Sequence, residues 1–310
     1  MSDTVIVGTR ESKLAVTQTK WVVHELEKHA LRAKFSLHYI TTEGDRKLDI
    51  SLTEFQQSGM FINELEEKLQ AKEIDVAVHS LKDIPLQTDD AYPIVAIPMR
   101  EDFRDAYIGK ENVPLDQLRD GAIIGTSSPR RKAQLQATYP HLKTKWIRGP
   151  IDSRIKQMKE GAYDGIILAV AGLNRLGLTD VITTYLDPVS FTPAPGQGAL
   201  AVQCRAEDEH IVRSLRSIHH EDTYKAVYAE RHVVLQLDEE DKAPIGAYAT
   251  VSDGVISLYA SVYSMDGKSV LTSEAQHHDP FEVAKLVADD LVKQGAHSII
   301  GAAKEELQNE

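Results

Sequence analysis

The stretch "AIIGTSSPRRKAQL", residues 122–135, joins an apolar strand to the start of a helix. Ser128 stands where an N-cap is expected and Pro129 at the first helical position, so we predict that the helix begins there. The same alternation of short apolar runs and amphipathic stretches continues through the first two-thirds of the chain. This pattern is typical of parallel sheets covered by helices and predicts an α/β fold.

Six further apolar runs are predicted to be strands of these sheets. They are "TVIVG", "FSLHYI", "IDVAVHS", "PIVAIP", "KTKWIRG" and "GIILAVAG". The helix predicted after the first of them is amphipathic and places on one face Leu14, Trp21, Val22 and Leu26. Because even the longest apolar run, "GIILAVAGL", is about half a membrane span, we expect no transmembrane segment.

The pattern changes from about Ser217 onward. "VISLYASVY" alternates strictly, and its apolar face consists of Ile256, Leu258, Ala260 and Val262. Asp266–Gly267 predicts a hairpin turn after this strand. A helix capped by Asp279 and Pro280 follows and ends at Gly295; its inward positions are expected to be Val283, Leu286, Val287 and Leu291. These features predict a separate α+β domain.

Composition limits the class of protein. The 310 residues are 42% hydrophobic and 26% charged, which is ordinary for two or three globular domains. The net charge of −12 argues against a general nucleic-acid binder. The single cysteine, Cys204, excludes an internal disulfide framework and suits a reducing compartment. With no signal-peptide pattern at the N-terminus, we expect a soluble cytoplasmic protein.

Basic residues gather where predicted strands end and helices begin. Arg130, Arg131 and Lys132 occupy the first turn of the helix that Ser128 caps, a position that disfavours cations unless an anion joins them. Similar positions at strand exits or helix starts are held by Arg10, Arg148, Arg154 and Arg175. Guanidinium groups pair with carboxylates and phosphates, so the pattern predicts a ligand with several anionic groups. The alternative is that these are exposed arginines on surface helices. The sequence has no Walker loop, so it gives no specific support for a nucleotide phosphate as the ligand.

Lys82 and Asp83 supply the candidate reactive group. They follow the apolar run "IDVAVHS" and precede Pro85, which puts them at a strand exit beside the predicted arginines. A carboxylate among cations stays ionised and can stabilise a cation or accept a proton. A purely structural Lys–Asp pair is the alternative. The twelve histidines show no metal-ligand spacing, so we expect no metal site, and Cys204 is expected to be a core residue.

Taken together, nine segments resemble the hydroxymethylbilane synthase family, also called porphobilinogen deaminase, over nearly the whole chain. They are "GTRESKLA", "TEGDRKLD", "EIDVAVHSLKDIP", "REDFRDAYI", "IIGTSSPRRKAQL", "KWIRGPIDSRI", "YDGIILAVAGLNRLG", "PAPGQGALAVQCR" and "PIGAYA". The resemblance implies two α/β domains like those of periplasmic binding proteins, with a cleft between them, and a small C-terminal α+β domain. The implied boundaries are 1–99 with 197–216, 100–196, and 217–310, with crossovers near "MREDFRD" and "PAPGQGAL".

The same resemblance implies a transferase of porphyrin and heme biosynthesis. Such enzymes join four porphobilinogen units into the linear tetrapyrrole hydroxymethylbilane with release of ammonia, and extend a dipyrromethane primer. Asp83 falls at the family's catalytic position. Implied cofactor-binding residues are Ser12, Lys82, Thr126, Ser128, Arg130, Arg131 and Arg154, and implied substrate-binding residues are Arg10, Arg148, Arg154 and Arg175. The expected partners are porphobilinogen and oligopyrrole polycarboxylates, without nucleic acid or membrane, and the expected state is a monomer.

Three segments depart from the family pattern. The family attaches dipyrromethane through a cysteine three residues before its Pro-Ile motif, and here that position is Asp241 in "LDEEDKAPIGAY". An aspartate cannot form a thioether, and its charge should repel a polycarboxylate. "QQSGMF" replaces the glycine-rich lid, with Ser58 in place of the lid lysine, and Glu43 replaces a base.

Three functions therefore stay open at the level of sequence. The first is a hydroxymethylbilane synthase whose primer is held without a thioether, supported by Asp83 and the complete set of arginines. The second is a non-polymerising paralogue that binds an oligopyrrole or another polycarboxylate, supported by the changes at Asp241 and Ser58. The third, an exported solute-binding protein, is disfavoured because no export signal is seen.

Overall fold

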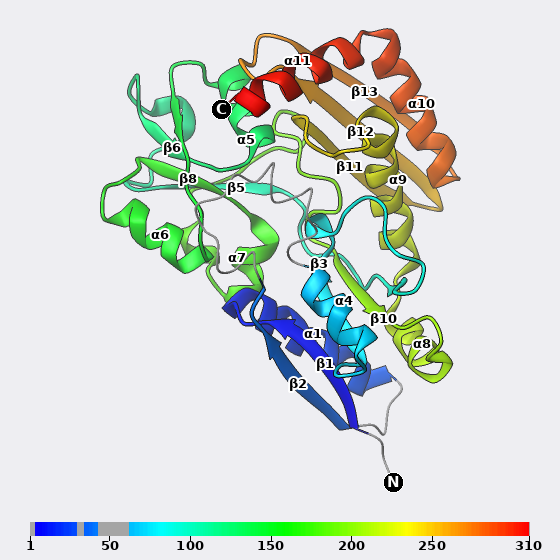
Figure 1. Ribbon diagram of the computed structural model, residues 1–310. Helices are drawn as coiled ribbons and strands as arrows, with labels where there is room; N and C mark the ends of the chain where they lie inside the picture. Colours follow the sequence, from blue (N-terminus) through cyan, green and yellow to red (C-terminus); the bar gives the residue numbers. More distant parts are fainter. Residues whose placement is uncertain (1–3, 30–33, 43–61, 310) are drawn as a thin grey trace.

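The computed structural model describes residues 4–29, 34–42 and 62–309. Their strands form three separate sheets, seen in Figure 1 at the bottom, the left and the upper right of the molecule. The predicted lid "QQSGMF" and Glu43 lie outside the described residues.

The first sheet has the strand order β2-β1-β3-β10-β4. β1 pairs in parallel with both β2 and β3, whereas β10 runs antiparallel to β3 and β4. The bounds are β1 Thr4–Arg10, β2 Lys34–Ile40, β3 Val76–Ser80, β4 Ile94–Ala96 and β10 Leu200–Cys204. The helices with this sheet are α1 Lys13–His29, α4 Asn63–Gln70, α8 Glu209–Leu215 and the short turns η1 Leu81–Asp83 and η4 Arg216–Ile218.

The second sheet repeats this plan with the order β7-β6-β8-β5-β9. β6 is parallel to β7 and β8, and β5 is antiparallel to β8 and β9. The bounds are β5 Asp105–Gly109, β6 Ile123–Gly125, β7 Lys143–Lys145, β8 Gly165–Ala169 and β9 Thr184–Tyr185. The helical segments are α5 Pro129–Thr138, α6 Ile151–Lys159, α7 Val170–Leu176, η2 Leu115–Gln117 and η3 Thr179–Val181.

The seven predicted strands run parallel within their sheets, whereas β5 and β10, which were not among them, run antiparallel to their neighbours. β5 and β10 follow the two connections that carry the chain from one sheet to the other, so each enters its sheet from the opposite direction. The predicted strand "GIILAVAG" also ends early, because the chain turns into α7 at Val170. α6 begins at Ile151, so Arg154 lies at its start as predicted.

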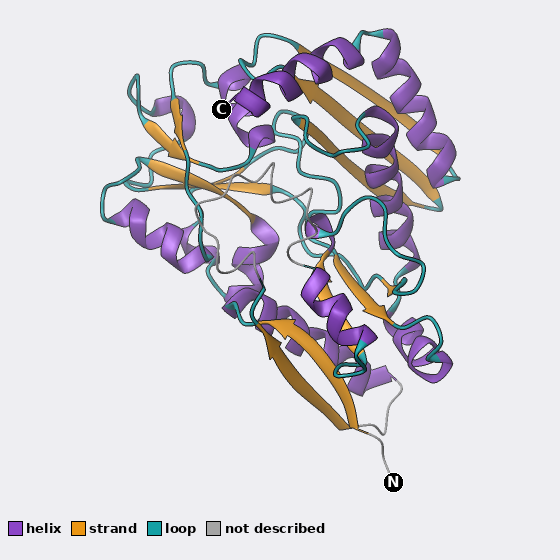
Figure 2. Cartoon of the chain, in the orientation of Figure 1, coloured by secondary structure: helices purple, strands orange, loops and turns teal. Residues whose placement is uncertain are grey.

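The third sheet is antiparallel, in the order β11-β12-β13, with bounds Ile245–Ser252, Val255–Tyr263 and Val270–His277. α9 Glu221–Leu237, α10 Pro280–Lys293 and α11 Ala296–Asn309 share an apolar core with it, and Figure 2 shows these helices beside its strands. The predicted apolar face of β12 is buried from Ile256 to Val262. Leu286, predicted to face inward, is 51% exposed, because it lies at the edge of the α10 stripe that Val283, Val287 and Leu291 bury.

Two α/β units and a C-terminal α+β unit are thus present, which confirms the predicted fold class; the residue boundaries between them stay a prediction.

The two connections between the first and second sheets meet α9 at a buried ion pair. Arg100 Nη1 and Nη2 donate to Glu230 at 2.6 and 2.9 Å, and Glu230 also accepts from the backbone N–H groups of Gly196 and Ala249. Glu230 therefore ties the third unit to both connections. No helix among the described segments is long and apolar enough to cross a bilayer.

Candidate active site

The segment that carries Asp83 follows the C-terminal end of β3, the central strand of the first sheet. Asp83 is exposed and Lys82 is half-buried, both within the turn η1. Arg231 of α9 donates to the carbonyl oxygens that surround this turn: Leu81 at 3.3 Å, Ile84 at 3.0 Å and Pro85 at 2.5 Å. The third unit therefore fixes the backbone on both sides of Asp83.

A buried aspartate in the second unit orients the two arginines of the opening motif. Asp105 has no solvent exposure; its Oδ2 accepts from Arg130 Nη2 at 2.9 Å and its Oδ1 from Arg131 Nη2 at 2.6 Å. Burial by itself would raise the pKa of Asp105, but the charges of Arg130 and Arg131 outweigh it and hold the pKa below its usual range. The anion that the first helical turn required is thus partly supplied by the protein itself.

The Asp105 carboxylate does not fully satisfy these arginines. Arg131 also donates to the Ile167 carbonyl at 3.0 Å, yet its buried Nε has no hydrogen-bond partner among the described residues. Two guanidinium groups share one carboxylate, so the pair keeps a net positive charge. Such a pair can take a further anion.

Gln197 joins this pair to the first unit. Its Oε1 accepts from Lys82 Nζ at 3.2 Å, and its Nε2 donates to Asp105 Oδ1 at 3.0 Å and to the Phe103 carbonyl at 2.8 Å. Lys82 and Arg131 are therefore brought to one place although they come from different sheets. Burial, and then the charge of Arg131, lowers the pKa of Lys82 to about 8.

Three more predicted arginines belong to the same electrostatic group. Burial, with the charges of Arg131 and Arg148, lowers the pKa of Arg154 to about 10, and Asp83 acts against that decrease. Burial and the charge of Arg10 lower the pKa of Arg148. Arg154 Nε donates to the Gly149 carbonyl at 2.6 Å, which fixes the start of its side chain. Closely placed cations with few internal anions favour an anionic ligand.

The predicted hydroxyl residues lie at helix starts. Ser128 caps α5 as predicted and accepts from the Arg131 N–H at 3.4 Å; Thr126 Oγ1 accepts from the Ser128 N–H at 3.2 Å. Ser12 Oγ accepts from the Ala15 N–H at 3.3 Å in the first turn of α1. These hydroxyl groups organise backbone around the arginines.

Arg175 is placed differently from the other arginines. Its Nη2 donates to the Gly198 carbonyl at 2.8 Å, on the second connection between the sheets. Burial lowers the pKa of Arg175 to about 10, and Glu101 opposes this decrease. No charge of the Lys82–Arg131 group contributes to this shift, so the structure supports a role at the connection more directly than a role in the cluster.

Two sequence models match nearly the whole chain. The model described as porphobilinogen deaminase, dipyromethane cofactor binding domain, matches residues 5–213, and the C-terminal domain model of the same family matches residues 224–293. The chain belongs to the porphobilinogen deaminase family. The membership predicted from the nine segments is confirmed.

Named relatives agree with this membership over their full length. A porphobilinogen deaminase of Oceanobacillus iheyensis is 45% identical over 304 residues, covering 98% of this chain and 98% of the relative. One from Bacillus velezensis is 43% identical over 309 residues, covering 99% of each. The non-polymerising alternative finds no support among these relatives.

Solved structures give more distant similarity. The periplasmic VFT2 domain of BvgS from Bordetella pertussis covers 69% of this chain and 86% of its own, with 13% identity and a TM-score of 0.42. A lipoprotein of the YaeC family from Enterococcus faecalis covers 77% of this chain and 97% of its own, with 14% identity and a TM-score of 0.43. Nothing about the ligand of this chain follows from these matches.

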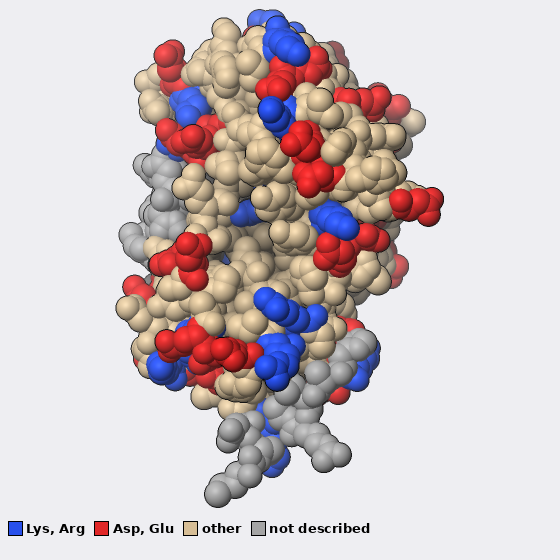
Figure 3. Space-filling view, turned by 90° about the vertical axis from the view of Figure 1, so that its right-hand side faces the viewer, with Lys and Arg blue, Asp and Glu red and all other residues tan. Residues whose placement is uncertain are grey.

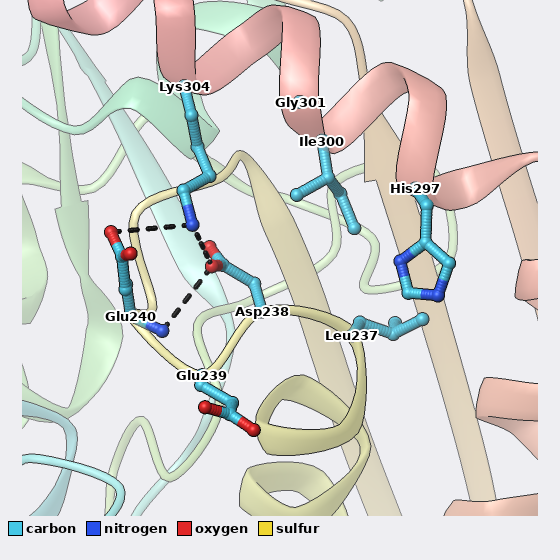
Figure 4. A pocket seen from close by; sticks show the side chains of 8 residues that line it. All are labelled: Leu237, Asp238, Glu239, Glu240, His297, Ile300, Gly301 and Lys304. Atoms are coloured by element: carbon cyan, nitrogen blue, oxygen red, sulfur yellow. Dashed lines mark hydrogen bonds and ion pairs between the residues drawn. The ribbon is translucent and has the colours of Figure 1, made fainter.

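The acidic loop after α9 is only partly solvated: Glu239 and Glu240 are exposed, whereas Asp238 is buried. Asp238 is only 4% exposed; its carboxylate accepts from the N–H groups of Lys242 and Ala243, both at 2.8 Å, and from Lys304 Nζ at 2.9 Å. Figure 4 shows Lys304 of α11 pointing between Asp238 and Glu240. These contacts offset the unfavourable position of anions at a helix C-terminus.

Beside the loop is a pocket of about 470 Å³, lined by Leu237, Asp238, Glu239, Glu240, His297, Ile300, Gly301 and Lys304.

Asp241 sits at the far side of this loop in a left-handed backbone conformation, with φ of 51°. Burial raises the pKa of Asp241 to about 7, while the charge of Arg231 acts in the opposite direction. Because Arg231 also holds the turn that bears Asp83, the Asp241 position is linked through one side chain to that turn. Burial therefore disfavours the ionised form of this acid.

Cys204 is not placed to bind a ligand covalently. It is fully buried in β10, as the sequence predicted, and burial raises the pKa of its thiol to about 11. A thiol that is neither exposed nor ionised is a poor nucleophile. Since Cys204 is the single cysteine of the chain, the residues present do not fit a thioether link to dipyrromethane.

Surface charge is distributed differently from the charge of the site. On the face shown in Figure 3, basic side chains lie beside acidic ones across the surface. By contrast, Arg130 and Arg131 are 6% and 7% exposed, and Lys82, Arg148 and Arg154 are half-buried. Sequence reasoning missed Asp105 and Gln197, although an acid at the start of the apolar strand "DAYIG" was a usable signal.

Proposed function

We propose that this chain is a hydroxymethylbilane synthase, which joins four porphobilinogen units head to tail and releases ammonia at each condensation. One observation carries the proposal: the exposed carboxylate of Asp83 lies beside a group of cations that two different sheets contribute. Porphobilinogen and its oligomers carry acetate and propionate groups, and their pyrrole rings form cations when ammonia leaves. The site offers complementary groups for both.

The cations would bind the carboxylates of the substrate and of the growing chain. Arg130 and Arg131 are held in fixed directions by Asp105, so little side-chain entropy is lost when an anion joins them. The proposed binding residues are those that the sequence nominated, except Arg175, which holds the second connection: Arg10, Ser12, Lys82, Thr126, Ser128, Arg130, Arg131, Arg148 and Arg154.

Asp83 would act on the reacting ring. When the C–N bond of the aminomethyl group breaks, the electron pair leaves with nitrogen, which takes a proton and departs as ammonia. The positive charge left on the pyrrole ring is stabilised by a nearby carboxylate that also accepts the ring N–H. The unsubstituted carbon of a second pyrrole then attacks the exocyclic carbon, and loss of its proton restores the aromatic ring.

The primer is the point at which this chain departs from the family's expected chemistry. The cations suit the carboxylates of a dipyrromethane, whereas neither Asp241 nor Cys204 suits a thioether. We therefore propose that any primer is held without a thioether, by the ionic contacts alone. Partial protonation of Asp241 near neutral pH would weaken its repulsion of a polycarboxylate.

Two measurements on the purified protein test the proposal. Consumption of porphobilinogen is expected for the wild type and is expected to fall by at least about 100-fold in Asp83→Asn. Asp90→Asn is the matched control, since Asp90 is also exposed in the segment between β3 and β4 but lies beyond the turn η1. Absence of turnover in the wild type, or full activity of Asp83→Asn, would contradict the assignment.

The intact mass of the protein tests the primer separately. We expect the mass of the bare chain for the wild type, and an added dipyrromethane mass for Asp241→Cys incubated with porphobilinogen. An adduct on the wild type that survives denaturation would show that another linkage exists. The monomeric state and the cytoplasmic location stay predictions, which sedimentation and cell fractionation can test.

A further inference from the structure

Gln197 is a buried, uncharged residue at the meeting point of two sheets and both connections. It has no solvent exposure, and its amide makes three contacts with other residues: Lys82 Nζ, Asp105 Oδ1 and the Phe103 carbonyl. Its backbone is fixed as well, because its carbonyl accepts from Arg100 Nε at 2.7 Å. Neither the family description nor the sequence pattern assigns it a role.

The charges around Lys82 explain why an amide at this position matters. The charged groups that act on the Lys82 ammonium are Arg131, Asp83, Asp105 and Arg130. Asp105 already pairs with both arginines, and Asp83 is exposed to solvent. An amide oxygen can hold the ammonium in place without cancelling its charge, whereas a carboxylate would neutralise it.

The oxygen and the nitrogen of the Gln197 amide contact residues of two different units. The oxygen takes a hydrogen bond from the lysine of the first unit, and the nitrogen gives one to the carboxylate that orients Arg130 and Arg131 in the second unit. We propose that Gln197 is a positioning residue that holds the Lys82 ammonium and the Asp105–Arg131 pair in one fixed arrangement, so that both units bind the same anionic group. This rests on the proposed function for the identity of that group.

Three variants test the role of Gln197. Gln197→Met keeps the volume but removes the acceptor and the donor; Gln197→Glu keeps the shape but adds a charge. The matched control is Gln203→Met, because Gln203 is also fully buried and its amide donates to the Tyr92 carbonyl and to Glu66, neither of which is among the groups that act on the charge of Lys82. Thermal unfolding of each variant shows whether it is folded, and Gln197→Glu serves if Gln197→Met is not.

The first readout is the charge of Lys82, measured without turnover. Acetylation of Lys82 by trace acetic anhydride, followed by mass spectrometry at several pH values, reports the pH at which its amine becomes reactive. We expect this pH to move down in Gln197→Met, which removes an acceptor of the ammonium, and up in Gln197→Glu, which adds a negative charge. A loosened but otherwise unaltered site would not move the two variants in opposite directions.

The second readout is the rate of porphobilinogen consumption. A hydrogen bond to a charged group predicts a loss of about 10-fold to 100-fold in kcat/KM for Gln197→Met, and less than about threefold for Gln203→Met. If Lys82 reactivity is unchanged in both Gln197 variants, the inference is wrong, whatever the rates. It is also wrong if an active wild type loses no more in Gln197→Met than in Gln203→Met. An inactive wild type overturns the proposed function alone, because the acetylation profile still decides the role of Gln197.

Discussion

Replacing Asp105 by asparagine removes the one anion that two buried guanidinium groups share. The side chain has 0% exposure, and the side chains of Arg130 and Arg131 are 7% and 9% exposed. Asparagine has the same shape and keeps an acceptor for Gln197. The variant therefore removes the charge and, with it, the acceptor of one of the two arginines, while the volume of the side chain is kept.

The expected loss is large because solvent cannot replace the missing carboxylate. An exposed ion pair contributes about 0–1 kcal/mol, whereas removing one partner of a buried pair costs about 3–5 kcal/mol, since the other charge stays buried without compensation. Here two ion pairs, at 2.9 and 2.6 Å, depend on the same group. We expect the free energy of unfolding of Asp105→Asn to fall by about 3–5 kcal/mol.

Urea unfolding followed by circular dichroism measures this loss, and Asp164→Asn is the control. Asp164 pairs with Arg119 at 3.1 Å, but that pair is 30% and 71% exposed, so a loss of about 0–1 kcal/mol is expected. Sulfate should restore stability to Asp105→Asn more than to the wild type, because an anion that binds the folded state alone stabilises it.

Two results would refute this reasoning. Equal losses in Asp105→Asn and Asp164→Asn would mean that the buried arginines do not need their carboxylate. Equal stabilisation of Asp105→Asn and the wild type by sulfate would mean that the uncompensated arginines do not attract anions.

Three further predictions concern the connections and the loop around Asp241. Gly198→Ala should destabilise the protein by at least about 2 kcal/mol in urea unfolding, because φ is +89° and the added Cβ would meet the Glu101 carbonyl at 2.5 Å. Asp241→Asn should raise the free energy of unfolding by up to about 4 kcal/mol at pH 8 and leave it unchanged near pH 4, because each unit between the unfolded and folded pKa corresponds to about 1.4 kcal/mol. The raised pKa means that the folded state binds a proton more tightly, so the wild type loses stability as pH rises from about 4 to above 7. Arg231→Met should lower kcat about 10-fold with a smaller change in KM, since it releases the turn that bears Asp83; equal kcat values would contradict this.

Local sequence predicted local structure well where the chain's own neighbours decide it. The cap at Ser128, the alternation of β12 and the cap of α10 by Asp279 all match, because each depends on groups within a few residues. The prediction that Leu286 faces inward was wrong. A residue at the edge of an apolar helix stripe can be buried or exposed, and the packing of the helix against the sheet decides which.

Sequence by itself also determined the chemical character of the site, since each basic residue follows a strand or opens a helix and the nine segments identify the family. Only the tertiary structure decided how these charges are balanced. Asp105 lies 25 residues from Arg130, and Gln197 lies 115 residues from Lys82, so no local pattern relates them. Burial makes these few contacts decisive, because a charge removed from water depends on whichever groups the fold places against it.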